Sequence, residues 1–172
     1  MFFSFPVLMY HSISRYKDVL SVAPEQFDEH CRSLAQAGWR GIPLGEAEEY
    51  FLRKKRIPRK SCLLTFDDGY LDNYVHAEPI LRHYGHYGAI FPVAECLGSV
   101  NAPRRPTKET NASDSQPPPS LPNLDARPPV VRSGRRVRRI RFCNWNEIQW
   151  MHHQGHMAAA PHSLRHDRVV RS

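Results

Sequence analysis

The run LLTFDDGY at positions 63–70 ends an apolar stretch with two adjacent carboxylates, Asp67 and Asp68, followed by Gly69. The apolar part predicts a buried strand, and Gly69 permits a sharp turn after it. In α/β folds, catalytic groups usually lie at the carboxyl ends of the strands. Two acids there could divide the work, with one binding a cation and its neighbour acting as a general base. An isolated Asp-Asp-Gly is also an ordinary polar turn, so this run alone leaves both interpretations open.

Two histidines near the end of the sequence, His162 and His166, are four residues apart. On a helical turn or a tight loop this spacing places both imidazoles on one face, where they can bind one metal ion. The spacing alone is weak evidence, because the chain has 10 histidines. We expect those at positions 76, 83, 86, 152, 153 and 156 to lie at the surface. His11 directly follows the first predicted strand. It could lie at the same site as Asp67 and Asp68 or belong to the core, so it is assigned no role.

The elements that must position these residues alternate between strands and helices. Strands are predicted at 5–10, 39–44, 61–66 and 89–94, and helices at 24–37, 46–55 and 79–84. The segment 70–76 is expected to be irregular. Later in the chain, Asn144 and Glu147 have the spacing of a capping box that opens a helix, and a strand at 156–160 leads to His162. The alternation predicts an α/β fold with parallel strands joined by crossover helices.

The charge of the chain is concentrated in one segment. The net charge is +7 over 172 residues, and the segment 101–142 carries 10 basic and 3 acidic residues, so that the rest is neutral. The same segment is rich in proline and contains the run RRVRRIR at 135–141. Such a composition cannot bury a core, and we expect a disordered insertion over 101–141. No aromatic residue lies among the arginines to stack on bases, so no specific nucleic-acid partner is expected.

The four cysteines, at positions 31, 62, 96 and 143, are widely spaced and contain no CxxC pair. They predict neither a zinc cluster nor a disulfide framework, and Cys62 is expected in the core. The apolar N-terminus has no basic region and is broken by Pro6, which argues against a signal peptide. No stretch is long enough to span a membrane. We therefore expect a cytoplasmic chain as written, with association with the cell envelope as the alternative.

The two motifs, taken in order, resemble those of the polysaccharide deacetylase family, also called the NodB-homology or carbohydrate esterase family 4 domain. TFDDG at 65–69 is similar to the first motif of the family, and HSLRH at 162–166 to the second. The entry LMYHS at 8–12 and the run YLDNY at 70–74 also look like members that act on N-acetylglucosamine polymers. The resemblance covers residues 7–93 and 142–166.

This resemblance implies a distorted (β/α) barrel, of which the chain would form a part. It implies a divalent metal, usually zinc, held by Asp68, His162 and His166, with Asp67 as the general base. Three protein ligands leave an open position for water or substrate, and the metal lowers the pKa of that water and polarises an amide carbonyl. The expected reaction is hydrolysis of the N-acetyl group of an amino-sugar polymer or oligomer, giving a free amine and acetate.

The chain departs from the family after the second motif. Family members continue with an arginine-proline-aromatic motif, a tryptophan/aspartate motif and a late leucine-x-histidine that supplies the general acid, and the sequence stops at Ser172. We therefore expect one truncated domain over 1–172, divided into 1–100, the insertion 101–141 and 142–172, with impaired activity. The alternatives are an inactive glycan- or metal-binding remnant and a basic protein that binds nucleic acid or anionic surfaces through 132–141.

Overall fold

The computed structural model describes residues 5–15, 19–52, 56–98, 141–153 and 155–163. The elements in chain order are β1 (Val7–Tyr10), β2 (Ser12–Ile13), β3 (Ser21–Val22), α1 (Pro24–Gln36), β4 (Arg40–Gly41), α2 (Leu44–Phe51), β5 (Ser61–Asp68), the π-helical turn η1 (Asn73–Ala77), α3 (Glu78–Tyr84), β6 (Gly88–Pro92), the 3-10 turn η2 (Ala94–Cys96), α4 (Trp145–His153) and β7 (Met157–Ala159). The predicted alternation of strands and helices is confirmed.

The main sheet is parallel, with the strand order β1-β5-β6-β7 and with β4 paired to β5. In register, Tyr10 lies opposite Phe66, and Asp68 lies opposite Pro92. The central strand β5 is buried along almost its whole length, and its apolar residues accordingly do not alternate strictly with polar ones. Because the strands are parallel, their carboxyl ends meet at one edge of the sheet.

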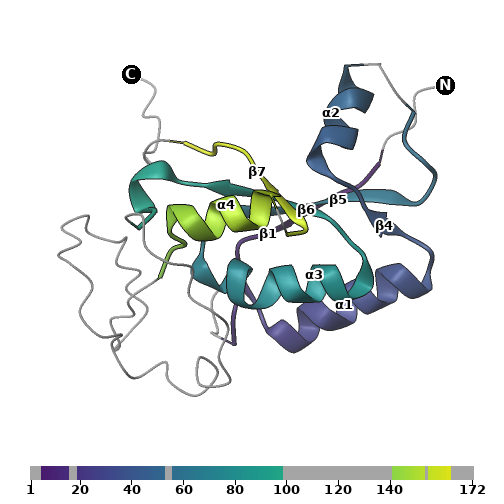
Figure 1. Cartoon of the computed structure of the whole chain (residues 1–172). Helices are drawn as coiled ribbons and strands as arrows, with labels where there is room; N and C mark the ends of the chain where they lie inside the picture. Colours follow the sequence, from purple (N-terminus) through teal and green to yellow (C-terminus); the bar gives the residue numbers. More distant parts are fainter. Residues whose placement is uncertain (1–4, 16–18, 53–55, 99–140, 154, 164–172) are drawn as a thin grey trace, which may run out of the picture.

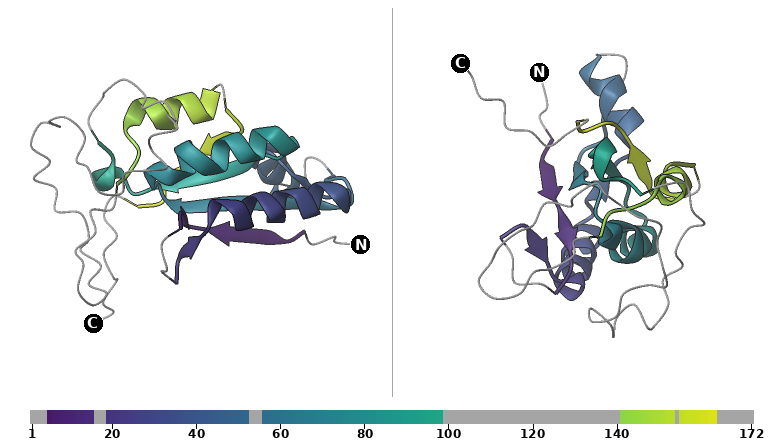
Figure 2. Two further views of the ribbon diagram at one scale, coloured as in Figure 1. Left: turned by 90° about the horizontal axis from the view of Figure 1, so that it is seen from below. Right: turned by 90° about the vertical axis from the view of Figure 1, so that its left-hand side faces the viewer.

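Three helices, α1, α3 and α4, lie along one face of this sheet (Figures 1 and 2). The core between them and the sheet is centred on large side chains with no exposed surface, such as Phe27 of α1 and Phe66 of β5, whose rings meet edge to face. Tyr10 of β1 stacks on Phe66 at 5.5 Å between ring centroids. Helix α4 joins the layer through Trp150, whose ring lies 4.9 Å from the Arg82 guanidinium of α3.

The other face of the sheet is covered differently. Helix α2 stands apart from the three-helix layer in Figure 1, and its Ala47 forms a small core with Ile42 and with Leu63 of β5. Along β1, Val7 and Met9 are 54% and 64% exposed. The alternation of β1 therefore sends Tyr10 into the main core and leaves two apolar side chains in solvent.

Element boundaries differ from the sequence predictions where tertiary contacts decide them. The predicted strand 39–44 is reduced to Arg40–Gly41, since only these residues pair with β5. The segment expected to be irregular is largely η1. Two short strands, β2 and β3, which the sequence analysis did not predict, pair between β1 and α1. Apart from Arg141, the predicted insertion 101–141 lies outside the described residues. Among the described residues, no helix is long and apolar enough to cross a membrane.

The start of α4 confirms the predicted capping box. The Asn144 backbone N–H donates to Glu147 Oε2 at 2.8 Å, and the Glu147 backbone N–H donates to Asn144 Oδ1 at 2.9 Å. Each side chain therefore satisfies a backbone donor that the first helical turn leaves open. Cys62, with no exposed surface, is a core residue as predicted, and all four cysteines are free thiols.

His86 is the clearest error among the sequence predictions. It was expected at the surface, but only 1% of it is exposed. Its Nδ1 accepts from the Gly41 backbone N–H at 3.2 Å, and its Nε2 lies 2.9 Å from the Cys31 carbonyl oxygen, so that Nε2 carries the hydrogen. A neutral imidazole with this tautomer links β4 to α1. The sequence does not reveal such a role, because both partners are backbone atoms distant along the chain.

Replacing His86 with leucine is expected to lower the free energy of unfolding by about 2–4 kcal/mol, because it leaves two buried backbone groups without their partner. Urea denaturation of the purified chain measures the change. The matched control is His83→Leu at an exposed position of α3, which should stay within about 0.5 kcal/mol of the parent. Equal effects of the two variants would contradict the bridging role of His86.

Candidate active site

Asp67 and Asp68 are the last two residues of β5, at the carboxyl edge of the sheet, as predicted. The Asp68 carboxylate is 12% exposed and the Asp67 carboxylate 18%. Asp68 has φ of 70°, in the left-handed region that residues other than glycine rarely adopt. Backbone strain of this kind is concentrated at functional sites, so the conformation of Asp68 favours a functional role over an ordinary turn.

Gly69 continues the left-handed turn with φ of 77°. A Cβ atom at this position would lie 2.7 Å from Pro92 Cβ and 3.0 Å from Pro92 Cα of the neighbouring strand. The turn therefore requires glycine for two independent reasons, its backbone angle and its close approach to β6. This confirms the turn that the sequence predicted after the two acids.

Replacing Gly69 with alanine is expected to lower the free energy of unfolding by about 1–3 kcal/mol, because the left-handed backbone and the contact with Pro92 both oppose a side chain. The control is Gly45→Ala in α2, where a Cβ atom would meet nothing within 4 Å. That variant should be neutral or slightly stabilising, since alanine favours a helix. Thermal or urea unfolding distinguishes the two, and a neutral Gly69→Ala would show that the turn relaxes freely.

His162 reaches the same edge by extending the path of β7 along β6. The Ala160 backbone N–H donates to the Ile90 carbonyl at 3.0 Å, and the His162 N–H donates to the Pro92 carbonyl at 3.3 Å. Because Pro92 lies opposite Asp68 in the register, His162 is brought across β6 toward that acid. Its Nε2 lies 4.0 Å from Asp68 Oδ1. The two predicted ligands, 94 positions apart in the sequence, therefore come together.

His11 joins the site from the opposite side. Tyr10 is paired with Phe66, and the residues that follow them are His11 and Asp67, respectively. The His11 Nε2 lies 3.9 Å from Asp67 Oδ2, and the imidazole is 17% exposed. His11 therefore lies beside Asp67 at the same edge of the sheet and is partly buried. The signal that could have found it was its position directly after a predicted strand parallel to β5.

The donor set fits a divalent metal as far as the described residues reach. Zinc binds carboxylate oxygen and imidazole nitrogen at about 2.0–2.2 Å, so atoms 4.0 Å apart can share one ion after a small movement. The third predicted ligand, His166, lies outside the described residues. Within the described part of the chain, no group of three potential ligand side chains is close enough to hold an ion.

Cys96 lies on η2 beside this edge. Burial, and then the neighbouring Asp68 and Glu95 carboxylates, raise the pKa of the Cys96 thiol above its usual value. A thiol with a raised pKa stays protonated at neutral pH and is a poor nucleophile. Cys96 is therefore not suited to act as a nucleophile at this edge of the sheet.

Asp72 is a residue near the site that sequence analysis assigned no role. Its Oδ2 accepts from the Ser12 hydroxyl at 2.7 Å, and its Oδ1 accepts from the Ile13 backbone N–H at 3.0 Å. It therefore connects the segment after the DDG turn to the residues that follow His11. The pairing spans about 60 positions and follows no local spacing rule. Ser12 and Asp72 stand in the two runs, 8–12 and 70–74, that resemble the family, but nothing in either run indicates that they are in contact.

Comparison with known proteins gives consistent results for sequence and fold. A model of the polysaccharide deacetylase family matches residues 54–172. YxkH of Bacillus subtilis (strain 168), provisionally named a polysaccharide deacetylase, is 39% identical over 93 residues, which make up 54% of this chain and 33% of YxkH. The chain thus spans about a third of the length of that relative.

Among solved structures, IcaB from Ammonifex degensii aligns with a TM-score of 0.65 at 23% identity, covering 93% of this chain and 53% of that one. A de-N-acetylase from Aggregatibacter actinomycetemcomitans aligns with a TM-score of 0.62 at 20% identity, covering 92% and 54%. At these identities the likeness concerns the fold. The chain has the α/β fold of these proteins, a partial (β/α) barrel, as the motifs implied.

Proposed function

Because the chain belongs to the polysaccharide deacetylase family, we propose that it is a metal-dependent hydrolase that removes N-acetyl groups from an amino-sugar polysaccharide or oligosaccharide. The observation that carries this proposal is the convergence of Asp67, Asp68 and His162 at the carboxyl edge of one parallel sheet. These are three of the four residues that the two motifs nominate for the reaction. The products are a free amine on the sugar and acetate.

The residues that would hold the metal, with zinc as the proposed ion, are Asp68, His162 and His166. A carboxylate and two imidazoles form the kind of three-ligand set that leaves a position open for catalysis. When bound, the metal supplies Lewis-acid chemistry, polarising the amide carbonyl of the substrate and lowering the pKa of a water molecule. The left-handed backbone of Asp68 and its mostly buried carboxylate support this assignment, since backbone strain is concentrated at functional sites.

Asp67 is the proposed general base. It precedes Asp68 at the carboxyl end of β5, on the edge of the sheet where the proposed metal ligands lie. It would accept the proton of the water that attacks the acetyl carbon. Its Oδ2 faces His11, which leaves the carboxylate bounded on one side by an imidazole.

The proposal is tested by incubating the purified chain with an N-acetylglucosamine oligomer and measuring the acetate released. We expect release with zinc present, none after treatment with a chelator, and recovery when zinc is restored. If the chain binds one zinc per molecule but releases no acetate from any N-acetylated oligomer, it is a metal- or glycan-binding module instead. Release that is indifferent to chelation would refute the metal-dependent mechanism.

A further inference from the structure

The segment after the DDG turn folds back onto the loop that follows β1. Asp72, at the start of η1, uses both carboxylate oxygens there, accepting from the Ser12 hydroxyl at 2.7 Å and from the Ile13 N–H at 3.0 Å. Hydrogen bonds to an ionised carboxylate are shorter and stronger than those between neutral groups. Ser12 is 6% exposed and Ile13 has no exposed surface, so these bonds lie in a largely buried setting.

These contacts fix the backbone on both sides of His11. On the amino side, Tyr10 pairs with Phe66 in the sheet and stacks on its ring. On the carboxyl side, Asp72 holds the two residues that come next. His11 is therefore confined between β1 and the hydrogen bonds that Ser12 and Ile13 donate to Asp72, which we call the carboxylate clamp. Its imidazole lies 3.9 Å from Asp67 Oδ2.

Asp72 and Asp67, the carboxylate that His11 approaches, belong to the same short stretch of chain. Asp72 lies five residues after Asp67, beyond the left-handed turn of Asp68 and Gly69. That stretch therefore approaches the His11 region at two points. Asp67 lies near the His11 imidazole, and Asp72 binds Ser12 and Ile13. A loop held at two points of one rigid turn keeps its geometry more closely than a loop held at one point.

We propose that Asp72 is a positioning residue which, by binding Ser12 and Ile13, holds the His11 imidazole against the Asp67 carboxylate. The inference rests on the proposed role of Asp67 as the base. Held in this way, His11 restrains the carboxylate on its Oδ2 side and leaves the other oxygen to meet the attacking water. The separation of 3.9 Å is longer than a hydrogen bond, as is common in catalytic pairs before substrate binds.

The first test measures the position of His11 without any need for activity. Histidine ring signals are recorded by NMR on the full chain, and the His11 signal is identified by its loss in His11→Gln. In Asp72→Ala we expect this signal to shift and broaden, whereas Asp72→Asn should largely preserve it, because the amide oxygen can still accept from the Ile13 N–H. An unchanged His11 signal in a folded Asp72→Ala chain would overturn the proposal.

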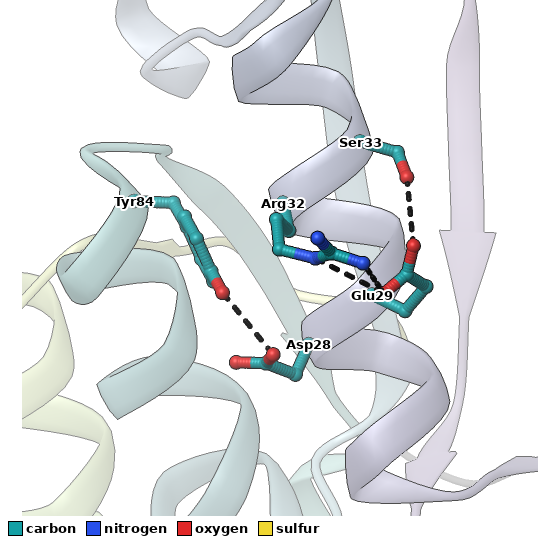
Figure 3. Close-up of polar contacts among 5 residues, drawn as sticks. All are labelled: Asp28, Glu29, Arg32, Ser33 and Tyr84. Atoms are coloured by element: carbon teal, nitrogen blue, oxygen red, sulfur yellow. Dashed lines mark hydrogen bonds and ion pairs between the residues drawn. The ribbon is translucent and has the colours of Figure 1, made fainter.

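The matched control is Asp28→Ala. Asp28 of α1 also accepts a hydroxyl hydrogen bond between two elements, from Tyr84 of α3 at 3.1 Å (Figure 3). Thermal unfolding of both variants measures the general loss of stability. The His11 signal should remain in place in Asp28→Ala, and its movement there would show that any weakening of the fold displaces the imidazole, which also contradicts a specific role for Asp72.

The second test uses acetate release. Asp72→Ala should lower kcat by about 10-fold to 100-fold, with KM and zinc content little changed, since about 1 Å of misplacement costs rates of this order. In a His11→Ala background the same substitution should have almost no further effect on kcat. Additive losses would show that Asp72 does not act through His11. If the parent chain releases no acetate, the proposed function fails, while the NMR result still decides the position of His11.

Discussion

Asp67→Asn is expected to lower the rate of acetate release by at least about 10²-fold to 10⁴-fold, the range usually attributed to a general base. Asparagine has nearly the same shape as aspartate but cannot accept a proton from water. The adjacent Asp68 and the position of His162 should be undisturbed, because the substitution preserves the volume at the end of β5. The measurement is kcat on an N-acetylglucosamine oligomer, with zinc content determined on the same sample.

The zinc content separates a lost base from a damaged site. It should remain near the parent value in Asp67→Asn, and Asp28→Asn on α1 should retain both zinc and activity as the control for removing one carboxylate charge. Retained activity in Asp67→Asn would exclude this residue as the base. Loss of zinc together with activity would instead assign Asp67 to the metal site.

His162→Ala is expected to weaken zinc binding by at least about 100-fold, since even residues that only orient a ligand typically contribute 10-fold to 100-fold to metal affinity. Titration with zinc in competition with a chromophoric chelator measures the change. Because a metal ion bound by the folded chain also stabilises it, the parent should gain thermal stability on adding zinc and the variant should gain much less.

The control for this experiment is His153→Ala. His153 is an exposed residue of the last turn of α4 and belongs to a histidine-rich stretch, so it tests whether any histidine on the surface contributes to zinc uptake. Its zinc affinity should equal that of the parent. If His162→Ala leaves the affinity unchanged, or if both variants weaken it equally, the assignment of His162 as a ligand is wrong.

The position of two acids at the end of a buried strand could be predicted from the sequence, because it depends on local patterns. A continuous apolar run ending in Asp67 and Asp68 predicts a buried strand with two acids at its carboxyl edge, and Gly69 marks the turn after it. The Asn144–Glu147 capping box has a similarly local signature and was confirmed. The placement of His166 lies outside the described residues, so it stays a prediction.

Contacts between distant segments were not visible in the same way. His86 was expected at the surface, yet it is buried between backbone groups of β4 and α1, because core histidines are specified by partners that carry no side-chain signature. The clamp between Asp72 and the Ser12–Ile13 pair is of the same kind. The alternation of apolar and polar residues and the spacing of motifs describe residues close together in the chain. These contacts join residues 45 to 60 positions apart.

The sequence by itself determined that parallel strands would carry Asp67, Asp68 and His162 to their ends, and that the order of the motifs resembles one enzyme family. Only the tertiary structure decided how far apart these ends lie. The pairing of Asp68 with Pro92 and the hydrogen bond from His162 to the Pro92 carbonyl bring His162 to Asp68, and the pairing of Tyr10 with Phe66 brings His11 to Asp67. Register is a property of paired backbones, set by the packing of whole strands, so it cannot be read from any one of them.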